Sequence, residues 1–189
     1  MTPKGQARKQ AIVDAARGLF HERGYHATGI DEIGAAAGIT GPGIYRHFDS
    51  KDQILATIFD QMWLGLLHTI DRARELEPAQ ALDLLMDNHV EAIVDSPGDV
   101  ILLLNELRSL PDDYRARAAA NDRTYQEAWA SPIHQLHPSL SEDEALVAAR
   151  SAMWAITSYD IGDAGDDLTP EDAKLLLKKL ARASIDSLS

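Results

Sequence analysis

Apolar residues recur three or four positions apart along almost the whole chain, and this spacing constrains the fold more than any other feature. The first clear stripe joins Ile12, Ala16, Leu19 and Phe20, which share one face of a helix. No segment alternates apolar and polar residues in the manner of a half-buried strand. The pattern therefore predicts an all-α protein of about nine helices.

Glycine and proline residues divide this pattern into segments. The segment around Pro132 to Ser139 is expected to be a loop, and an acidic turn is expected over 162–167. The predicted helices cover residues 5–23, 30–37, 41–48, 51–76, 79–95, 99–110, 112–129, 142–161 and 170–188.

Charge is distributed unevenly along the 189 residues, whose net charge is −12. Residues 1–51 hold seven basic and five acidic side chains, whereas the remainder holds 11 basic and 25 acidic side chains. A polyanion is therefore compatible with the amino-terminal part and is repelled by the rest. This asymmetry indicates two parts with different roles.

The composition also excludes several classes of protein. The chain has no cysteine, which excludes disulfides and cysteine-ligated zinc. Its amino terminus lacks the apolar core of a signal peptide, and no run of about 18 apolar residues could span a bilayer. We expect a cytoplasmic protein with no membrane partner and no cofactor.

The amino-terminal pattern, a longer helix followed by two short helices and a glycine turn, has the layout of a helix-turn-helix DNA reader. The residues that carry a resemblance to a known family are Gly24-Tyr25, Thr28, Ile33, Ala37-Gly38-Ile39-Thr40, Ile44-Tyr45-Arg46-His47-Phe48 and Ser50-Lys51. Over about residues 8–55 they resemble the signature of the tetracycline-repressor (TetR) family. That resemblance implies a homodimeric, all-helical repressor with a DNA-binding domain over 1–50 and a ligand-binding and dimerisation domain over 51–189.

The second short helix would enter the major groove. Thr40 is expected to cap it, and its first amide groups could meet phosphate. Gly41 and Gly43 add no bulk, so the backbone can approach base edges, and Pro42 suits a thymine methyl group. Arg46 could bind guanine through two hydrogen bonds. The alternatives are capping alone for Thr40, a solvated side chain for Arg46, and simple turn chemistry for Gly41, Pro42 and Gly43.

The family resemblance adds four phosphate contacts, at Thr28, Tyr45, His47 and Lys51. Such contacts position a protein on DNA without reading its sequence. For Thr28 the alternative is a helix cap.

The sequence also departs from the family pattern in this region. Gly34 stands where the family usually has Ala, and Asp31 places negative charge near the DNA backbone. Lys4, Arg8 and Lys9, on an amino terminus expected to fray, could offset that charge by reaching phosphates or the minor groove.

Beyond residue 52 no motif stands out, and the ligand site is inferred from the family alone. Bulky side chains with few polar groups suit a small, largely apolar effector. Plain core packing is the alternative for every one of them, and a satisfied core histidine is the alternative for His89. The candidates are Trp63, Leu67, Met86, His89, Leu103, Tyr125, Trp129 and Met153.

The last two helices carry small and apolar stripes that could pair across a two-fold axis into a four-helix interface. Packing within one chain is the alternative. His134 and His137 fall in the expected proline-bounded loop, so no metal site is predicted. The stripes are Ala145, Ala148, Ala149, Ala152, Met153 and Ile156, then Leu175, Leu176, Lys179, Leu180 and Ile185.

The sequence thus favours a DNA-binding regulator, most simply a repressor that a ligand releases from a palindromic operator. Two alternatives stay open at this point. One is a DNA-binding dimer that needs no effector. The other is a helical enzyme with a vestigial motif, although no catalytic set of residues is recognisable and no catalytic residue is predicted.

Overall fold

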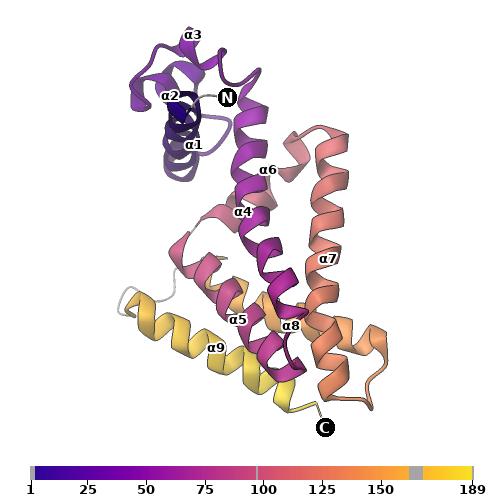
Figure 1. Cartoon of the computed structure of the whole chain (residues 1–189). Helices are drawn as coiled ribbons and strands as arrows, with labels where there is room; N and C mark the ends of the chain where they lie inside the picture. Colours follow the sequence, from indigo (N-terminus) through magenta and orange to yellow (C-terminus); the bar gives the residue numbers. More distant parts are fainter. Residues whose placement is uncertain (1–2, 97, 162–167, 189) are drawn as a thin grey trace. The chain divides into compact units, whose positions relative to one another are not determined.

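The computed structural model describes residues 3–96, 98–161 and 168–188, and these residues form nine α-helices and no strand (Figure 1). The all-α prediction is confirmed. A short 3-10 helix (Leu107–Ser109) follows the sixth α-helix. The α-helices are α1 (Pro3–Arg23), α2 (Ile30–Ala36), α3 (Gly41–Ile44), α4 (Lys51–Ala73), α5 (Pro78–Asp95), α6 (Asp99–Glu106), α7 (Asp112–Leu136), α8 (Glu142–Ile161) and α9 (Pro170–Asp186).

Four helices end three or more residues from their predicted ends, namely α3, α4, α6 and α7, and α6 passes into the 3-10 helix at Leu107. Helix α3 is a single turn, and residues 45–47 continue as a turn in which the Phe48 N–H donates to the Ile44 carbonyl at 3.0 Å. Helix α7 runs through Pro132 to Leu136, so the predicted loop is wrong. Trp129 and Ile133 flank this proline and are fully buried, and their packing offsets the hydrogen bond that proline cannot make. The acidic turn predicted over 162–167 lies outside the described residues.

Contacts divide the chain into two compact units. Unit 1 comprises Met1–Gln61 and Ile101–Arg115, and unit 2 comprises Met62–Val100 and Ala116–Ser189. The start of α4 belongs to unit 1 because Asp52 accepts a hydrogen bond from the Tyr25 hydroxyl. The Phe59 and Tyr114 rings also meet there, with centroids 6.4 Å apart. The domain boundary expected at residue 50 stays a prediction.

Unit 1 is built around the helix-turn-helix. The apolar stripe of α1 packs against α2, and the Phe20 and Tyr25 rings meet edge to face with centroids 5.1 Å apart. Helix α4 starts at a cap, since Ser50 Oγ accepts from the Gln53 N–H at 3.1 Å. The fully buried apolar residues here include Ile12, Val13, Ala16, Ile33, Ile44, Ile54, Leu55, Ile58 and Phe59.

In unit 2, helices α5, α8 and α9 pack against one another (Figure 1). Ser141 and Glu144 begin α8 with a capping box, in which the Ser141 N–H donates to Glu144 Oε2 at 2.7 Å. The stripe predicted for a dimer interface on α8 lies mostly inside the protomer. Its buried members are Ala145, Ala149, Ala152, Met153 and Ile156.

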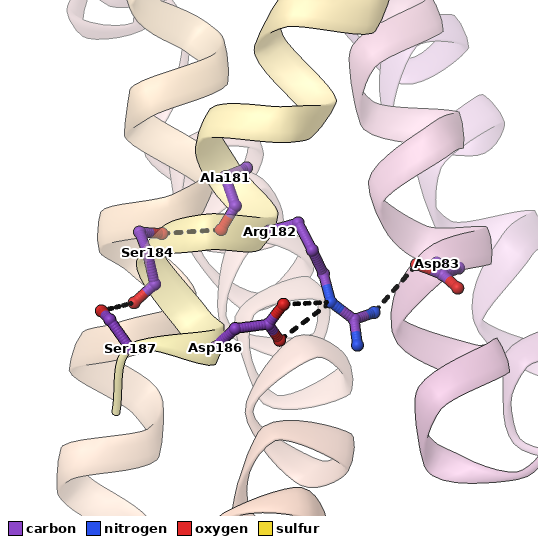
Figure 2. Close-up of polar contacts among 6 residues, drawn as sticks. All are labelled: Asp83, Ala181, Arg182, Ser184, Asp186 and Ser187. Atoms are coloured by element: carbon purple, nitrogen blue, oxygen red, sulfur yellow. Dashed lines mark hydrogen bonds and ion pairs between the residues drawn. The ribbon is translucent and has the colours of Figure 1, made fainter. Parts of the chain in front are cut away.

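Helix α9 attaches to this unit through one buried row at four-residue spacing, namely Ala173, Leu177, Ala181 and Ile185. Charged side chains reinforce the contact along one flank. Figure 2 shows Arg182 lying between Asp83 of α5 and Asp186 of its own helix. Three ion pairs join α9 to α5: Lys174 with Asp95 (Nζ–Oδ1 2.8 Å), Lys178 with Asp87, and Arg182 with Asp83 (Nη1–Oδ1 2.9 Å).

Candidate nucleic-acid interface and interior cluster

The turn between α2 and α3 depends on two glycines. Gly38 has φ +69°, a left-handed conformation that residues with a Cβ rarely adopt. Gly34 is buried where the two helices meet, and a Cβ there would lie 2.9 Å from the Gly41 backbone nitrogen. The departure from the family's usual alanine therefore allows α2 and α3 to approach closely.

The amino-terminal end of α3 has little side-chain bulk, because it consists of Gly41, Pro42 and Gly43. Thr40 occupies the N-cap position as predicted, but its hydroxyl makes no capping hydrogen bond, so the expected side-chain cap is wrong. The turn is instead closed by the backbone, where the Gly43 N–H donates to the Thr40 carbonyl at 2.8 Å. Pro42 is exposed, whereas Gly41 is buried against the Asp31 carboxylate. Direct DNA contact by Gly41 stays a prediction.

Several predicted DNA-binding side chains gather around one hollow of about 440 Å³ on the surface of unit 1. The expectation that Arg8 could reach a phosphate from the basic amino terminus stays a prediction. That terminus is helical from Pro3 onward and not the frayed segment expected. The hollow is lined by Thr40, Pro42, Gly43, Arg46 and His47, with Arg8 contributed by α1.

Two other predicted contacts face inward. Thr28 is 1% exposed and its Oγ1 lies 2.9 Å from the Gly24 carbonyl at the end of α1, so its side chain is not available to phosphate. Gly29, and not Thr28, occupies the N-cap position of α2. Thr28 is thus a structural residue that ties α1 to the next loop.

Lys51 also makes contacts within unit 1. Its Nζ donates to the carbonyls of Tyr25 and Thr28, at 2.8 and 2.9 Å, and lies 4.3 Å from the centre of the Tyr25 ring. Two of its three N–H donors are therefore engaged, which leaves one for the predicted phosphate contact. Burial, followed by the hydrogen bond to Asp52, raises the pKa of Tyr25 well above its ordinary value and keeps the phenol protonated.

Of the two acidic residues of α2, Glu32 is engaged within the protein. Glu32 Oε2 accepts from the Gly29 N–H at 2.8 Å, and Glu32 Oε1 pairs with Arg23 at 2.9 Å. These contacts satisfy the start of α2 and offset negative charge near the reading surface. Tyr45 is exposed just beyond α3, and its phosphate contact stays a prediction.

Unit 2 contains a buried polar cluster. The His89 ring lies 5.7 Å from both the Tyr125 and Trp129 rings. Its Nε2 is 3.2 Å from Thr157 Oγ1 and its Nδ1 is 3.4 Å from the Tyr125 hydroxyl. Burial lowers the pKa of His89 to about 4, against a smaller opposing effect of a hydrogen bond to the Met153 backbone. The imidazole is therefore neutral, with one nitrogen donating and the other accepting.

Seven of the eight predicted ligand-contacting residues lie in unit 2, and Leu103 lies in unit 1. Met86, His89, Tyr125, Trp129 and Met153 are all buried in unit 2. Trp63 is buried and Leu67 half-buried in the same unit, whereas Leu103 is half-buried in unit 1. Effector contact stays a prediction for all eight residues.

The described residues contain no group of three or more His, Asp or Glu side chains that could hold a metal ion. His134 lies on α7, and His137 is the first residue after that helix. None of the described helices has the length and apolar character that crossing a membrane requires.

Comparison with known proteins identifies the family. The family described as "Bacterial regulatory proteins, tetR family" matches residues 12–58, and "Tetracyclin repressor-like, C-terminal domain" matches residues 75–158. The transcriptional activator FasR of Mycolicibacterium smegmatis is 30% identical over 165 residues, which cover 82% of this chain and 68% of FasR. The repressor KstR2 of Rhodococcus jostii is 32% identical over 127 residues, which cover 65% of this chain and 61% of KstR2.

Solved structures share the fold. A TetR-family regulator from Rhodococcus RHA1 superposes with a TM-score of 0.82 at 18% identity and covers 96% of this chain and 97% of its own. AibR, solved with isovaleryl coenzyme A and operator DNA, has a TM-score of 0.77 at 24% identity, covering 92% of this chain and 97% of its own. With matches to both TetR domains and to FasR, this chain belongs to the TetR family of transcriptional regulators.

Proposed function

We propose that this protein is a homodimeric repressor that binds a palindromic operator through unit 1 and is released by a small, largely apolar effector. The observation that carries the DNA-binding part is the hollow beside α3, where the cationic Arg8 and Arg46 adjoin the surface of Pro42 and Gly43, which has little side-chain bulk. A groove-entering element needs such a surface, because bulk at its leading end would keep the backbone away from base edges.

The dimer is supported by exposed apolar side chains on the last two helices. Their exposure contrasts with the buried apolar residues of the same helices, such as Ala149, Ile156 and Leu177. Exposed leucines and a tryptophan gathered on adjoining helices are typical of an interface. The set comprises Val147, Trp154, Leu175, Leu176 and Leu180, which are 44–68% exposed.

The effector is assigned to unit 2 because its interior combines aromatic and thioether side chains with few buried polar groups, among them His89 and Thr157. Such a lining suits a ligand that is mostly apolar and has one hydrogen-bonding end. AibR was solved in complex with isovaleryl coenzyme A, and KstR2 of Mycobacterium tuberculosis is a ketosteroid transcriptional regulator. These relatives support acyl thioesters and steroids as the first ligands to test.

DNA binding is tested first. Purified protein is used to select duplexes from a random pool, and the recovered sequences are then measured by fluorescence anisotropy at several salt concentrations. We expect a palindrome whose half-sites are spaced by about one helical turn or a multiple of it. Recovery of no common sequence would contradict operator recognition.

Dimerisation is tested by light scattering after size-exclusion chromatography. The double variant Leu176→Glu/Leu180→Glu should run as a monomer, because charge at the centre of an apolar interface is costly. Leu64→Glu is the matched control, since Leu64 is 68% exposed on α4 and outside the proposed interface. A dimer that survives the double variant would refute the interface.

The effector is tested by thermal unfolding with acyl coenzyme A esters, steroids and aromatic acids. A ligand at 100 times its Kd should stabilise the folded protein by about 2.7 kcal/mol, and the same ligand should lower operator affinity. FasR is named an activator and KstR2 a repressor, so a promoter reporter decides the sign of regulation. Stabilisation by no ligand, with operator binding intact, would favour a regulator that needs no effector.

A further inference from the structure

Arg8, on the first helix, lies beside the reading surface formed by α3. Its Nη1 donates to the Ala37 carbonyl at 3.2 Å, across 29 residues of sequence. Ala37 is the C-cap residue of α2, directly before the turn at Gly38. The bond therefore fixes the guanidinium of Arg8 at the corner of the helix-turn-helix.

The remaining donors of this guanidinium are available to a ligand. Arginine carries five N–H donors in a planar fork, and the Ala37 carbonyl accepts from one nitrogen only. Arg8 is exposed and lines the hollow together with Arg46 and His47. Two arginines and a histidine around one hollow match a single anionic group flanked by sugar and base.

We infer that Arg8 binds a phosphate of the DNA backbone at the edge of each half-site. This inference rests on the proposed DNA-binding function and extends it to α1. A phosphate is favoured over a base because a guanidinium held by the protein backbone is fixed in place and has little freedom to follow a base edge. The contact positions α3 in the groove and carries no sequence preference of its own.

The test compares Arg8→Gln with Arg123→Gln, which removes the same charge from an exposed position on α7 in unit 2. Affinity for the selected operator is measured by anisotropy against salt concentration. Each lost phosphate contact lowers the slope of log K against log salt by about 0.9, so a dimer with two Arg8→Gln protomers should lose about 2. Arg123→Gln should leave the slope unchanged.

Two further measurements separate this role from others. Arg8→Lys keeps a point charge and should restore most of the slope, while binding less tightly than wild type because a lysine does not form the bidentate fork. Arg8→Gln should weaken the operator and single-base operator variants by the same factor.

The inference is overturned by a slope equal to that of Arg123→Gln, or by a change in preference at one base position, which would make Arg8 a base reader. Both outcomes leave wild-type operator binding intact, so they are distinct from a failure of the proposed function. Urea unfolding of Arg8→Gln should stay close to wild type, because the lost bond to Ala37 is exposed. If Arg8→Gln unfolds in the assay buffer, Arg8→Lys decides instead, and an operator affinity equal to that of wild type would overturn the bidentate phosphate contact.

Discussion

The neutral, buried His89 should make the stability of the protein fall as the pH decreases. The folded pKa of about 4 is below the ordinary value of 6.5, so the unfolded chain binds a proton that the folded chain excludes. This stability is fully present above pH 6.5 and is lost as the pH falls toward 4. A difference of 2.5 pKa units corresponds to about 3 kcal/mol in total. Between pH 7 and pH 5 the expected loss is about 2 kcal/mol.

The assay is urea unfolding of wild type and His89→Gln at pH 7 and pH 5, at one protein concentration because a dimer's stability depends on it. Glutamine keeps a donor and an acceptor near Thr157 and Tyr125 but does not titrate. Carboxylates titrate in both proteins, so the difference between their pH responses isolates His89. We expect wild type to lose about 2 kcal/mol more than the variant.

Equal losses in the two proteins would refute the reasoning. If His89→Gln does not fold, the ring resonances of wild type provide a second measurement by NMR. The signal assigned to His89 should stay that of neutral imidazole down to pH 5. A His89 ring that titrates near pH 6.5 would show that burial does not hold it neutral.

Three other substitutions test unit 1. Lys51→Gln should lower the free energy of unfolding by about 2 kcal/mol, because it removes charged hydrogen bonds to two carbonyls. The slope of log K against log salt should fall by at most about 1 per protomer. An unchanged free energy of unfolding in urea would contradict the anchoring role. Arg46→Ala should relax preference at one base position in a repeated selection, whereas uniform weakening would make it a phosphate contact. Gly34→Ala should destabilise by about 1 kcal/mol in urea unfolding, because its Cβ would press on the Gly41 backbone, and the control Gly18→Ala, with nothing within 4 Å, should stabilise by up to about 1 kcal/mol.

The helical periodicity was sufficient to predict the fold and most helix boundaries, because each helix buries one face and is closed by glycine, proline or a cap. It failed at Pro132, where the burial of Trp129 and Ile133 outweighs the local preference of proline to end a helix. Tertiary packing of this kind leaves no signal in the local spacing of residues. Only the structure shows it.

Sequence patterns likewise predicted the placement of only some residues of the candidate site. Arg46 and Pro42 were predicted from their position on a short helix, and both lie on the exposed surface. Thr28 and Lys51 match the family motif equally well, yet their polar atoms bind backbone carbonyls within the protein. A motif records that a residue type is needed at a position, and it does not distinguish a contact with DNA from a contact that holds the reader together.

The anchoring of Lys51 and Asp52 also bears on how an effector could act. These first two residues of α4 bind the loop between α1 and α2, through Thr28 and Tyr25. The close approach of Gly34 to Gly41 then fixes α3 to α2. Because each contact in this series is buried or hydrogen-bonded, a distortion of α3 alone would break several contacts at once. In the proposed dimer, a change in the spacing of two intact readers would therefore cost less free energy than the unfolding of either one.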